Sequence, residues 1–157
     1  MGDVCMLLKT VGKPKKVPIK MCKDAVKFFG RYLLGNKLYH DVEILMEFDD
    51  KELGRDVHGF CDWNDSNFRS RDFTITLNPT LGKRNMLLVI AHEMIHVKQY
   101  AKGELKDYVR MNRVKWKGRI YNDNKIDYWE LPWEIEAHGR EKGLYYKFIN
   151  HNQNKKR

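Results

Sequence analysis

The sequence predicts an α+β domain in which a small, mostly antiparallel sheet precedes two helices that carry the chemistry. Three segments with period-two alternation of apolar side chains predict strands at residues 42–48, 57–63 and 73–77. An apolar helical run follows at residues 86–100, and a last helix is expected over residues 132–149. A chain of 157 residues with 42% hydrophobic content suffices for one domain with a core and is short for two.

The ends of the chain predict little core. Lysines and two prolines crowd residues 1–20, which are expected to form a basic, poorly ordered lead-in. Residues 24–34 then carry apolar side chains at helical spacing, and Gly35 follows as a C-cap. The domain is therefore expected to span residues 21–150, with a basic, disordered tail over residues 151–157.

The most informative motif is HExxH, formed by His92, Glu93 and His96 inside the apolar helical run. Residues four apart lie on one face of a helix, so His92 and His96 can bind one Zn²⁺ ion through neutral imidazole nitrogens. Glu93 lies beside the pair and can take a proton from a metal-bound water. The alternative is two histidines that lie one turn apart without a metal. The motif predicts catalysis because a buried glutamate beside two stacked histidines serves little structural purpose.

A catalytic zinc site takes three protein ligands, so another donor must come from elsewhere in the chain. Pro132 suits the first turn of a helix on which Glu134 and His138 share a face, while Glu136 is rotated about 200° from Glu134. We choose Glu134 over Glu136 as the ligand, because His138 on the same face can bond a ligand or contact a substrate oxygen. The alternative is an amphipathic helix with solvated carboxylates.

The same last helix offers further catalytic groups. His138 is the first candidate to donate a hydrogen bond to the tetrahedral oxyanion, ahead of Tyr128 and Tyr145. Gly139 and Gly143 are expected to let the HExxH helix approach closely.

The two motifs together resemble a known class of enzymes. HEMIH, followed downstream by Glu134-Ile135-Glu136-Ala137, is similar to the small zincin metallopeptidases of the ImmA/IrrE type. The run from Phe73 into the HExxH helix also resembles SprT-like metallopeptidase domains, including phage members. The resemblance implies a minimal zincin-like fold, in which His92, His96 and Glu134 are the zinc ligands and Glu93 is the general base. SprT-like domains generally have a third histidine where this chain has Glu134.

The resemblance also implies where a substrate binds. In zincin-like folds the strand nearest the active helix is an exposed edge that pairs with an extended peptide. Residues 73–78 are the candidate edge, and an interior strand is the alternative.

A basic segment between the two motif helices indicates an anionic partner. Residues 111–121 suggest a strand or hairpin with a turn at Gly118, and they mix Trp116 and Tyr121 with lysine and arginine. Such a mixture suits single-stranded nucleic acid, and the alternative is a solvated basic strand. The net charge of +9 also favours DNA or an acidic protein surface, and SprT-like relatives act on proteins attached to DNA.

The remaining composition bounds the cellular setting. Cys5, Cys22 and Cys61 are widely spaced and odd in number, which predicts reduced thiols and no cysteine zinc cluster. No stretch approaches the roughly 20 apolar residues of a membrane span, so no membrane partner is expected. We expect a cytoplasmic protein, in the host cytoplasm if it is phage-encoded.

The sequence therefore predicts a zinc-dependent metallopeptidase that hydrolyses peptide bonds in a protein or peptide substrate. One alternative is a non-proteolytic, zinc-stabilised module that binds nucleic acid or a partner protein through its basic surface. Another is a zinc hydrolase of small amides, such as a deacylase.

Overall fold

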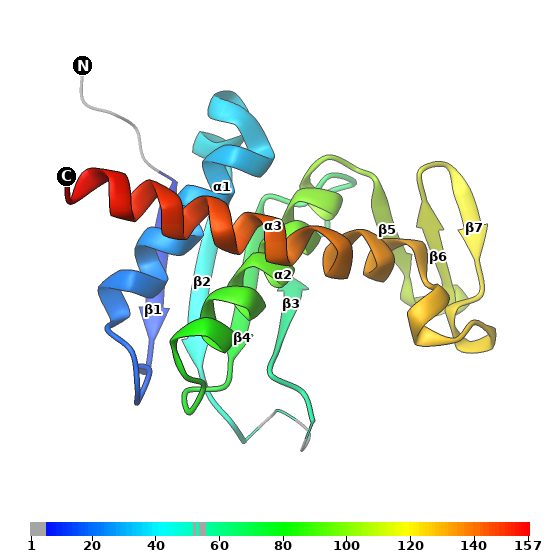
Figure 1. The fold of residues 1–157 in the computed structure, drawn as a ribbon. Coiled ribbons are helices and arrows are strands. Elements are labelled where there is room, and N and C mark those ends of the chain that lie inside the picture. Colours follow the sequence, from blue (N-terminus) through cyan, green and yellow to red (C-terminus); the bar gives the residue numbers. More distant parts are fainter. Residues whose placement is uncertain (1–5, 52, 54–55) are drawn as a thin grey trace.

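The computed structural model describes residues 6–51, 53 and 56–157, and these form an α+β fold with three α-helices and two sheets (Figure 1). The α+β class expected from the sequence is confirmed. The elements in chain order are β1 (Leu7–Val11), α1 (Ile19–Asp41), β2 (Glu43–Phe48), β3 (Gly59–Trp63), β4 (Asp72–Leu77), α2 (Lys83–Ala101), β5 (Leu105–Tyr108), β6 (Arg113–Trp116), β7 (Arg119–Tyr121) and α3 (Pro132–Lys155). Short 3-10 helices lie at Val109–Met111 (η1), Asp123–Lys125 (η2) and Tyr128–Glu130 (η3).

The larger sheet has the strand order β1-β2-β4-β3 and is mainly parallel. β1 pairs with β2, and β2 with β4, in parallel, whereas β3 is antiparallel to β4. The expectation of a mostly antiparallel sheet is thus wrong for this sheet, although the smaller sheet is antiparallel throughout. The alternation of apolar side chains predicted β2, β3 and β4 but not the direction of each strand. The chain passes through β3 between β2 and β4, and β4 then pairs with both.

The position of β4 corrects a second expectation. β4 lies between β2 and β3, so the segment at residues 73–78 is an interior strand and not the edge. Its side chains Phe73, Ile75 and Leu77, which share one face of the sheet, are fully buried. The edge strand on this side of the sheet is β3.

Both ends of the chain are more regular than expected. Residues 7–11 form β1, with Leu8 aligned to Ile44 of β2, so a poorly ordered lead-in is wrong for this stretch. The lysines and prolines of residues 1–20 led to the expectation of disorder, although Leu7–Val11 form a short edge strand. At the other end α3 continues to Lys155, which corrects the disordered tail over residues 151–155. Residues 1–5, which include Cys5, lie outside the described residues, and Cys22 and Cys61 are free thiols.

All three α-helices form the main core with the larger sheet. α1 buries Val26 and Phe29 completely, and its helical geometry breaks at Gly35, which has a φ of 76° as a glycine C-cap requires. α2 begins after Gly82, three residues before the apolar run expected from the sequence, and contacts β3, β4 and α1. α3 crosses over α2 (Figure 1), and the two helices are in contact along their length near the sheet's edge.

The smaller sheet, of order β5-β6-β7, has a separate small core. Lys117 and Gly118 both have positive φ values of 46° and 86°, so the two-residue turn between β6 and β7 is the kind that suits a tight hairpin. The hairpin expected over residues 111–121 is therefore confirmed. The buried residues of the small core are Leu105, Val114, Trp116, Leu131 and Trp133.

Within the described part of the chain, no helix combines the length and the apolar character that crossing a membrane requires.

Candidate metal centre

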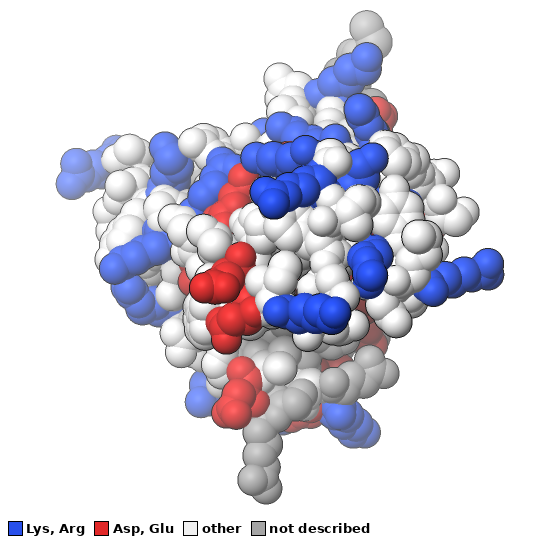
Figure 2. Space-filling model, turned by 90° about the vertical axis from the view of Figure 1, so that its right-hand side faces the viewer, with Lys and Arg blue, Asp and Glu red and all other residues white. Residues whose placement is uncertain are grey.

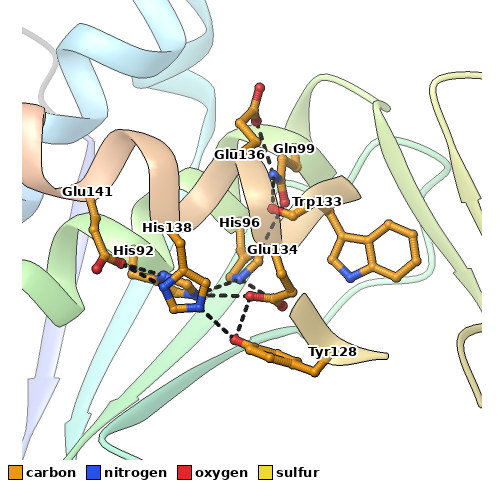
Figure 3. A network of polar contacts seen from close by, with 9 residues as sticks. All are labelled: His92, His96, Gln99, Tyr128, Trp133, Glu134, Glu136, His138 and Glu141. Atoms are coloured by element: carbon orange, nitrogen blue, oxygen red, sulfur yellow. Dashed lines mark hydrogen bonds and ion pairs between the residues drawn. The ribbon is translucent and has the colours of Figure 1, made fainter. Parts of the chain in front are cut away.

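α2 presents both motif histidines toward α3. The residues around them, Ile90, Met94 and Ile95, are fully buried in the core. His92 and His96 fall on the helix face opposite this apolar stripe, and Glu134 and His138 approach them from the first turns of α3 (Figure 3). The helical periodicity of both segments thus brings the two sequence motifs together.

Three potential ligand side chains converge between the two helices. Nε2 of His92 lies 3.2 Å from Nε2 of His96 and 3.2 Å from Oε2 of Glu134. Nε2 of His96 lies 3.4 Å from Oε1 of Glu134. A tetrahedral zinc ion with bonds of about 2.0–2.1 Å holds its nitrogen and oxygen ligands about 3.3–3.4 Å apart. The spacing of these side chains therefore fits one zinc ion.

The other ring nitrogens of both histidines have separate acceptors. Nδ1 of His92 lies 2.7 Å from Oε2 of Glu141, and Nδ1 of His96 lies 2.8 Å from Oε1 of Gln99. When each Nδ1 donates its hydrogen to that oxygen, each Nε2 of a neutral ring keeps a lone pair directed at the common point. Carboxylate or amide partners of this kind orient histidine ligands in metal sites.

Glu136 faces away from the histidines. Its Oε1 accepts hydrogen bonds from Nζ of Lys98 at 2.9 Å and from Nε2 of Gln99 at 3.0 Å. These contacts, with the ion pair to Lys98, hold the pKa of the Glu136 carboxyl below its usual value despite partial burial. Of the two glutamates weighed from the sequence, the structure brings Glu134 to the histidines and engages Glu136 elsewhere.

Tyr128 and His138 lie on the solvent side of the centre. The Tyr128 hydroxyl donates to Oε2 of Glu134 at 2.8 Å and lies 3.0 Å from Nε2 of His138. The rings of His138 and His92 are 4.5 Å apart. His92, Glu134 and His138 also form a group whose ligand atoms lie within 4.8 Å of one another. His96 also meets this pair, with its Nε2 3.2 Å from that of His92 and 3.4 Å from Oε1 of Glu134.

A cavity of about 670 Å³ opens at this centre. Glu93 lines the cavity and is only 5% exposed. Most of the wall is aromatic or aliphatic, and the edge strand β3 and the segment before it supply one side. The apolar lining consists of Val57, Phe60, Leu88, Val89, Tyr100, Leu105, Tyr128, Trp129 and Trp133.

The electrostatics follow from burial and close charges. Burial raises the pKa of the Glu93 carboxyl, against the lowering effect of the two histidines. Burial alone would lower the pKa of His92, but hydrogen bonds to Glu134 and Glu141 outweigh it and raise the pKa to about 10. Burial would raise the pKa of the Glu134 carboxyl, but hydrogen bonds to His92, His96 and Tyr128 hold this pKa far below its usual value. In the absence of metal, and despite burial, the nearby carboxylates raise the pKa of both His92 and His96 and so favour their protonated forms.

Several features of the site were missed or wrongly expected. Glu141 and Gln99 were not anticipated, although Gln99 lies three residues after His96 and Glu141 three after His138, spacings that share a helix face. The expected role of Gly139 and Gly143 is wrong, because a Cβ at either would meet no described atom within 4 Å. α2 and α3 meet instead near Ala137, which is fully buried. Tyr145 lies against Arg84 and is not among the described residues that line the cavity.

Comparison with known proteins adds no relative. No family model matches the chain, and no curated protein and no solved structure is significantly similar to it. The function must therefore be inferred from the residues of the site.

Proposed function

We propose that this chain is a zinc metallopeptidase with a minimal zincin-like fold. The single observation that carries the proposal is the convergence of His92, His96 and Glu134, whose ligand atoms lie 3.2–3.4 Å apart. These three side chains would hold the ion. A zinc ion bound there supplies a water with a pKa lowered to about 7 and a Lewis acid that polarises a carbonyl oxygen.

Glu93 is the general base of the proposed reaction. It lies next to His92 in sequence and its carboxyl lines the cavity at the centre. Because burial raises its pKa, the carboxylate is a stronger base than an exposed glutamate and suits proton transfer near neutral pH. It accepts a proton from the attacking water and delivers the proton to the leaving amine.

His138 is the proposed donor to the oxyanion, supported by Tyr128. The Tyr128 hydroxyl gives its hydrogen to Glu134, so its oxygen can accept from Nε2 of His138 at 3.0 Å. This chain of hydrogen bonds holds the His138 ring beside the cavity. When a substrate binds, the Nε2–H of His138 would turn from the Tyr128 oxygen to the carbonyl oxygen, where it would stabilise the developing negative charge.

The proposed substrate is a protein or peptide in extended conformation. β3 pairs with β4 on one side only, and Gly59, Phe60 and Cys61 of β3 line the cavity. An edge strand beside a catalytic centre can bind an extended chain through backbone hydrogen bonds. The apolar wall opposite favours substrates with apolar side chains near the cleaved bond.

The proposal is tested by metal content and by one substitution. Purified protein should contain zinc, and it should cleave a denatured protein such as casein or a fluorogenic peptide library. Glu93→Gln should abolish cleavage and leave bound zinc and thermal stability unchanged, since Gln preserves the shape of the side chain but cannot accept the proton. Equal cleavage by the wild type and the Glu93→Gln variant would show that Glu93 is not the general base.

A second candidate function is a zinc-stabilised module that binds nucleic acid. Figure 2 shows the end of the molecule that carries the smaller sheet, where lysine and arginine side chains are scattered among uncharged ones, with a cluster in the upper part, and acidic ones form a narrow band. The guanidinium of Arg119 lies 5.5 Å from the centre of the Tyr121 ring, whereas Trp116, the other aromatic residue expected to contact bases, is buried in the small core. Salt-sensitive retardation of single-stranded DNA would support this function, and no binding at low salt would remove it.

A further inference from the structure

The side-chain amide of Gln99 connects the two helices that carry the proposed ligands. Gln99 is fully buried and lies on α2, three residues after His96. Its Oε1 lies 2.8 Å from Nδ1 of His96. Its Nε2 donates to the backbone oxygen of Trp133 at 3.0 Å and to Oε1 of Glu136 at 3.0 Å (Figure 3). One amide therefore bonds a histidine of α2 on one side and two groups of α3 on the other.

The contacts to α3 fix the orientation of this amide. The NH₂ group has two hydrogens, and the two oxygens of α3 take both. The carbonyl oxygen must then face His96 and can only accept, so Nδ1 of His96 carries the hydrogen. Nε2 of His96 is left with its lone pair, 3.4 Å from Oε1 of Glu134. The histidine is thereby held in the tautomer that can bind a metal.

The same contacts fix where α3 begins. Trp133, whose oxygen accepts from Gln99, directly precedes Glu134. Glu136 is held in addition by Lys98, whose Nζ also lies 2.7 Å from Oε1 of Glu104. A shift of α3 along α2 would break the bonds of Gln99 to both acceptors, and it would move the Glu134 carboxylate away from His96.

We infer that Gln99 is a positioning residue of the metal centre: it sets the tautomer of His96 and the placement of Glu134 at the same time. The inference rests on the proposed function, because it assumes that these side chains hold a metal ion. Glu136 then has a role as well: by accepting a hydrogen bond from Nε2 of Gln99, it keeps the amide group from rotating so that nitrogen and oxygen exchange places.

The experiment measures metal binding by the full chain in four variants. Zn²⁺ affinity is measured by competition with a chromophoric chelator, and the visible spectrum of the Co²⁺-loaded protein reports the geometry around the ion. The variants are Gln99→Leu, Gln99→Glu, Glu136→Gln and the double variant Q99E/E136Q, in which acceptor and donor exchange places. Gln153→Leu, at an exposed site on α3, is the matched control.

We expect Gln99→Leu to lower Zn²⁺ affinity about 10- to 100-fold and to change the Co²⁺ spectrum, as loss of an outer partner does in metal sites. Gln99→Glu should also weaken binding, because the new carboxylate faces Glu136. The double variant should recover part of the lost affinity, because the new amide at position 136 can donate to the new carboxylate at position 99, whereas the backbone oxygen of Trp133 stays without its donor. A role in stability alone would lower the melting temperature of the metal-free protein and leave the Co²⁺ spectrum as in the wild type.

Two results would overturn the inference. Wild-type affinity and spectrum in Gln99→Leu would show that the amide does not position the ligands. If Gln99→Leu does not fold, the comparison of Gln99→Glu with Q99E/E136Q decides. A double variant that binds Zn²⁺ no better than Gln99→Glu would show that the hydrogen bond between positions 99 and 136 does not support the metal centre. A wild-type protein without any Zn²⁺ affinity would instead contradict the proposed function itself.

Discussion

Nδ1 of His92 lies 2.7 Å from Oε2 of Glu141, a residue 49 positions later in the chain. The contact joins the HExxH helix to the second turn of α3 beyond Glu134. It orients His92 as Gln99 orients His96, so each histidine of the motif has its own partner on the side away from the ligand atoms.

Removing this partner should weaken metal binding. Glu141→Gln is expected to lower Zn²⁺ affinity about 10- to 100-fold, because the amide is a weaker acceptor and can present the wrong atom to His92. Chelator competition measures the change. Glu130→Gln, at an exposed glutamate near the start of α3, is the control and should bind as the wild type does. Unchanged affinity in Glu141→Gln would show that the contact has no part in the centre.

The two glutamates at the start of α3 should differ sharply. Glu134→Ala should abolish stoichiometric Zn²⁺ binding, since it removes the carboxylate that lies 3.2 Å from His92. Glu136→Ala should retain the stoichiometry with reduced affinity, because Glu136 bonds Lys98 and Gln99 and not the histidines. Elemental analysis after dialysis against zinc and gel filtration measures both. Loss of zinc in the Glu136 variant alone would reverse the assignment.

The metal-free protein should lose stability as the pH rises from about 6.5 to about 10. The pKa of His92 in the folded chain is raised above its ordinary value, so the protonated ring stabilises the fold fully below pH 6.5 and this contribution disappears as pH passes 10. Melting temperatures in the presence of a chelator test this. With zinc bound the ring is unprotonated and this decline should vanish. A metal-free melting temperature that rises across the window would contradict the prediction.

His138 should affect turnover more than metal binding. His138→Ala is expected to lower kcat about 100-fold, the cost of one lost oxyanion donor, with KM and zinc content nearly unchanged. Tyr128→Phe should have a smaller effect of the same kind, because Tyr128 acts on the oxyanion only through the position of His138. Steady-state kinetics on a cleaved fluorogenic peptide separate kcat from KM. A loss of zinc in His138→Ala would place this side chain among the ligands.

Two glycines should respond oppositely to alanine. A Cβ at Gly59 would lie 2.7 Å from Cγ1 of Val89 and 2.9 Å from the oxygen of Thr76, so Gly59→Ala should destabilise the fold by about 1–3 kcal/mol. Gly139 is exposed within α3 and a Cβ there meets no described atom within 4 Å, so Gly139→Ala should stabilise by about 0.5–1 kcal/mol. Urea unfolding measures both. Stabilisation by Gly59→Ala would contradict the close packing of β3 on α2.

Local patterns predicted most of the secondary structure but not the arrangement of the strands. The period of apolar residues located α2 and β4, and the turn chemistry of Gly118 located the β6–β7 hairpin. The neighbours of β4 could not be predicted, because strand order depends on long-range packing that a period-two pattern does not encode. β1 was missed because its five residues adjoin a lysine-rich and proline-rich segment.

The candidate site was predictable to the extent that it lies on helices. His92 and His96 share a face of α2 because they are four apart, and the same rule put Glu134 and His138 together on α3. The contacts of Gln99 and Glu141 depend on how α2 and α3 cross, which the sequence does not give. Tyr128 precedes α3 in a separate 3-10 helix, so helical spacing could not place its hydroxyl beside Glu134.

The most direct test is the metal content of wild-type protein purified without added metal and analysed by mass spectrometry of the elements. We expect about one zinc ion per folded chain, removed by a strong chelator and restored by dialysis against zinc. A folded chain that contains no zinc, and takes up none on dialysis, would contradict the metal centre and the hydrolysis proposed for it.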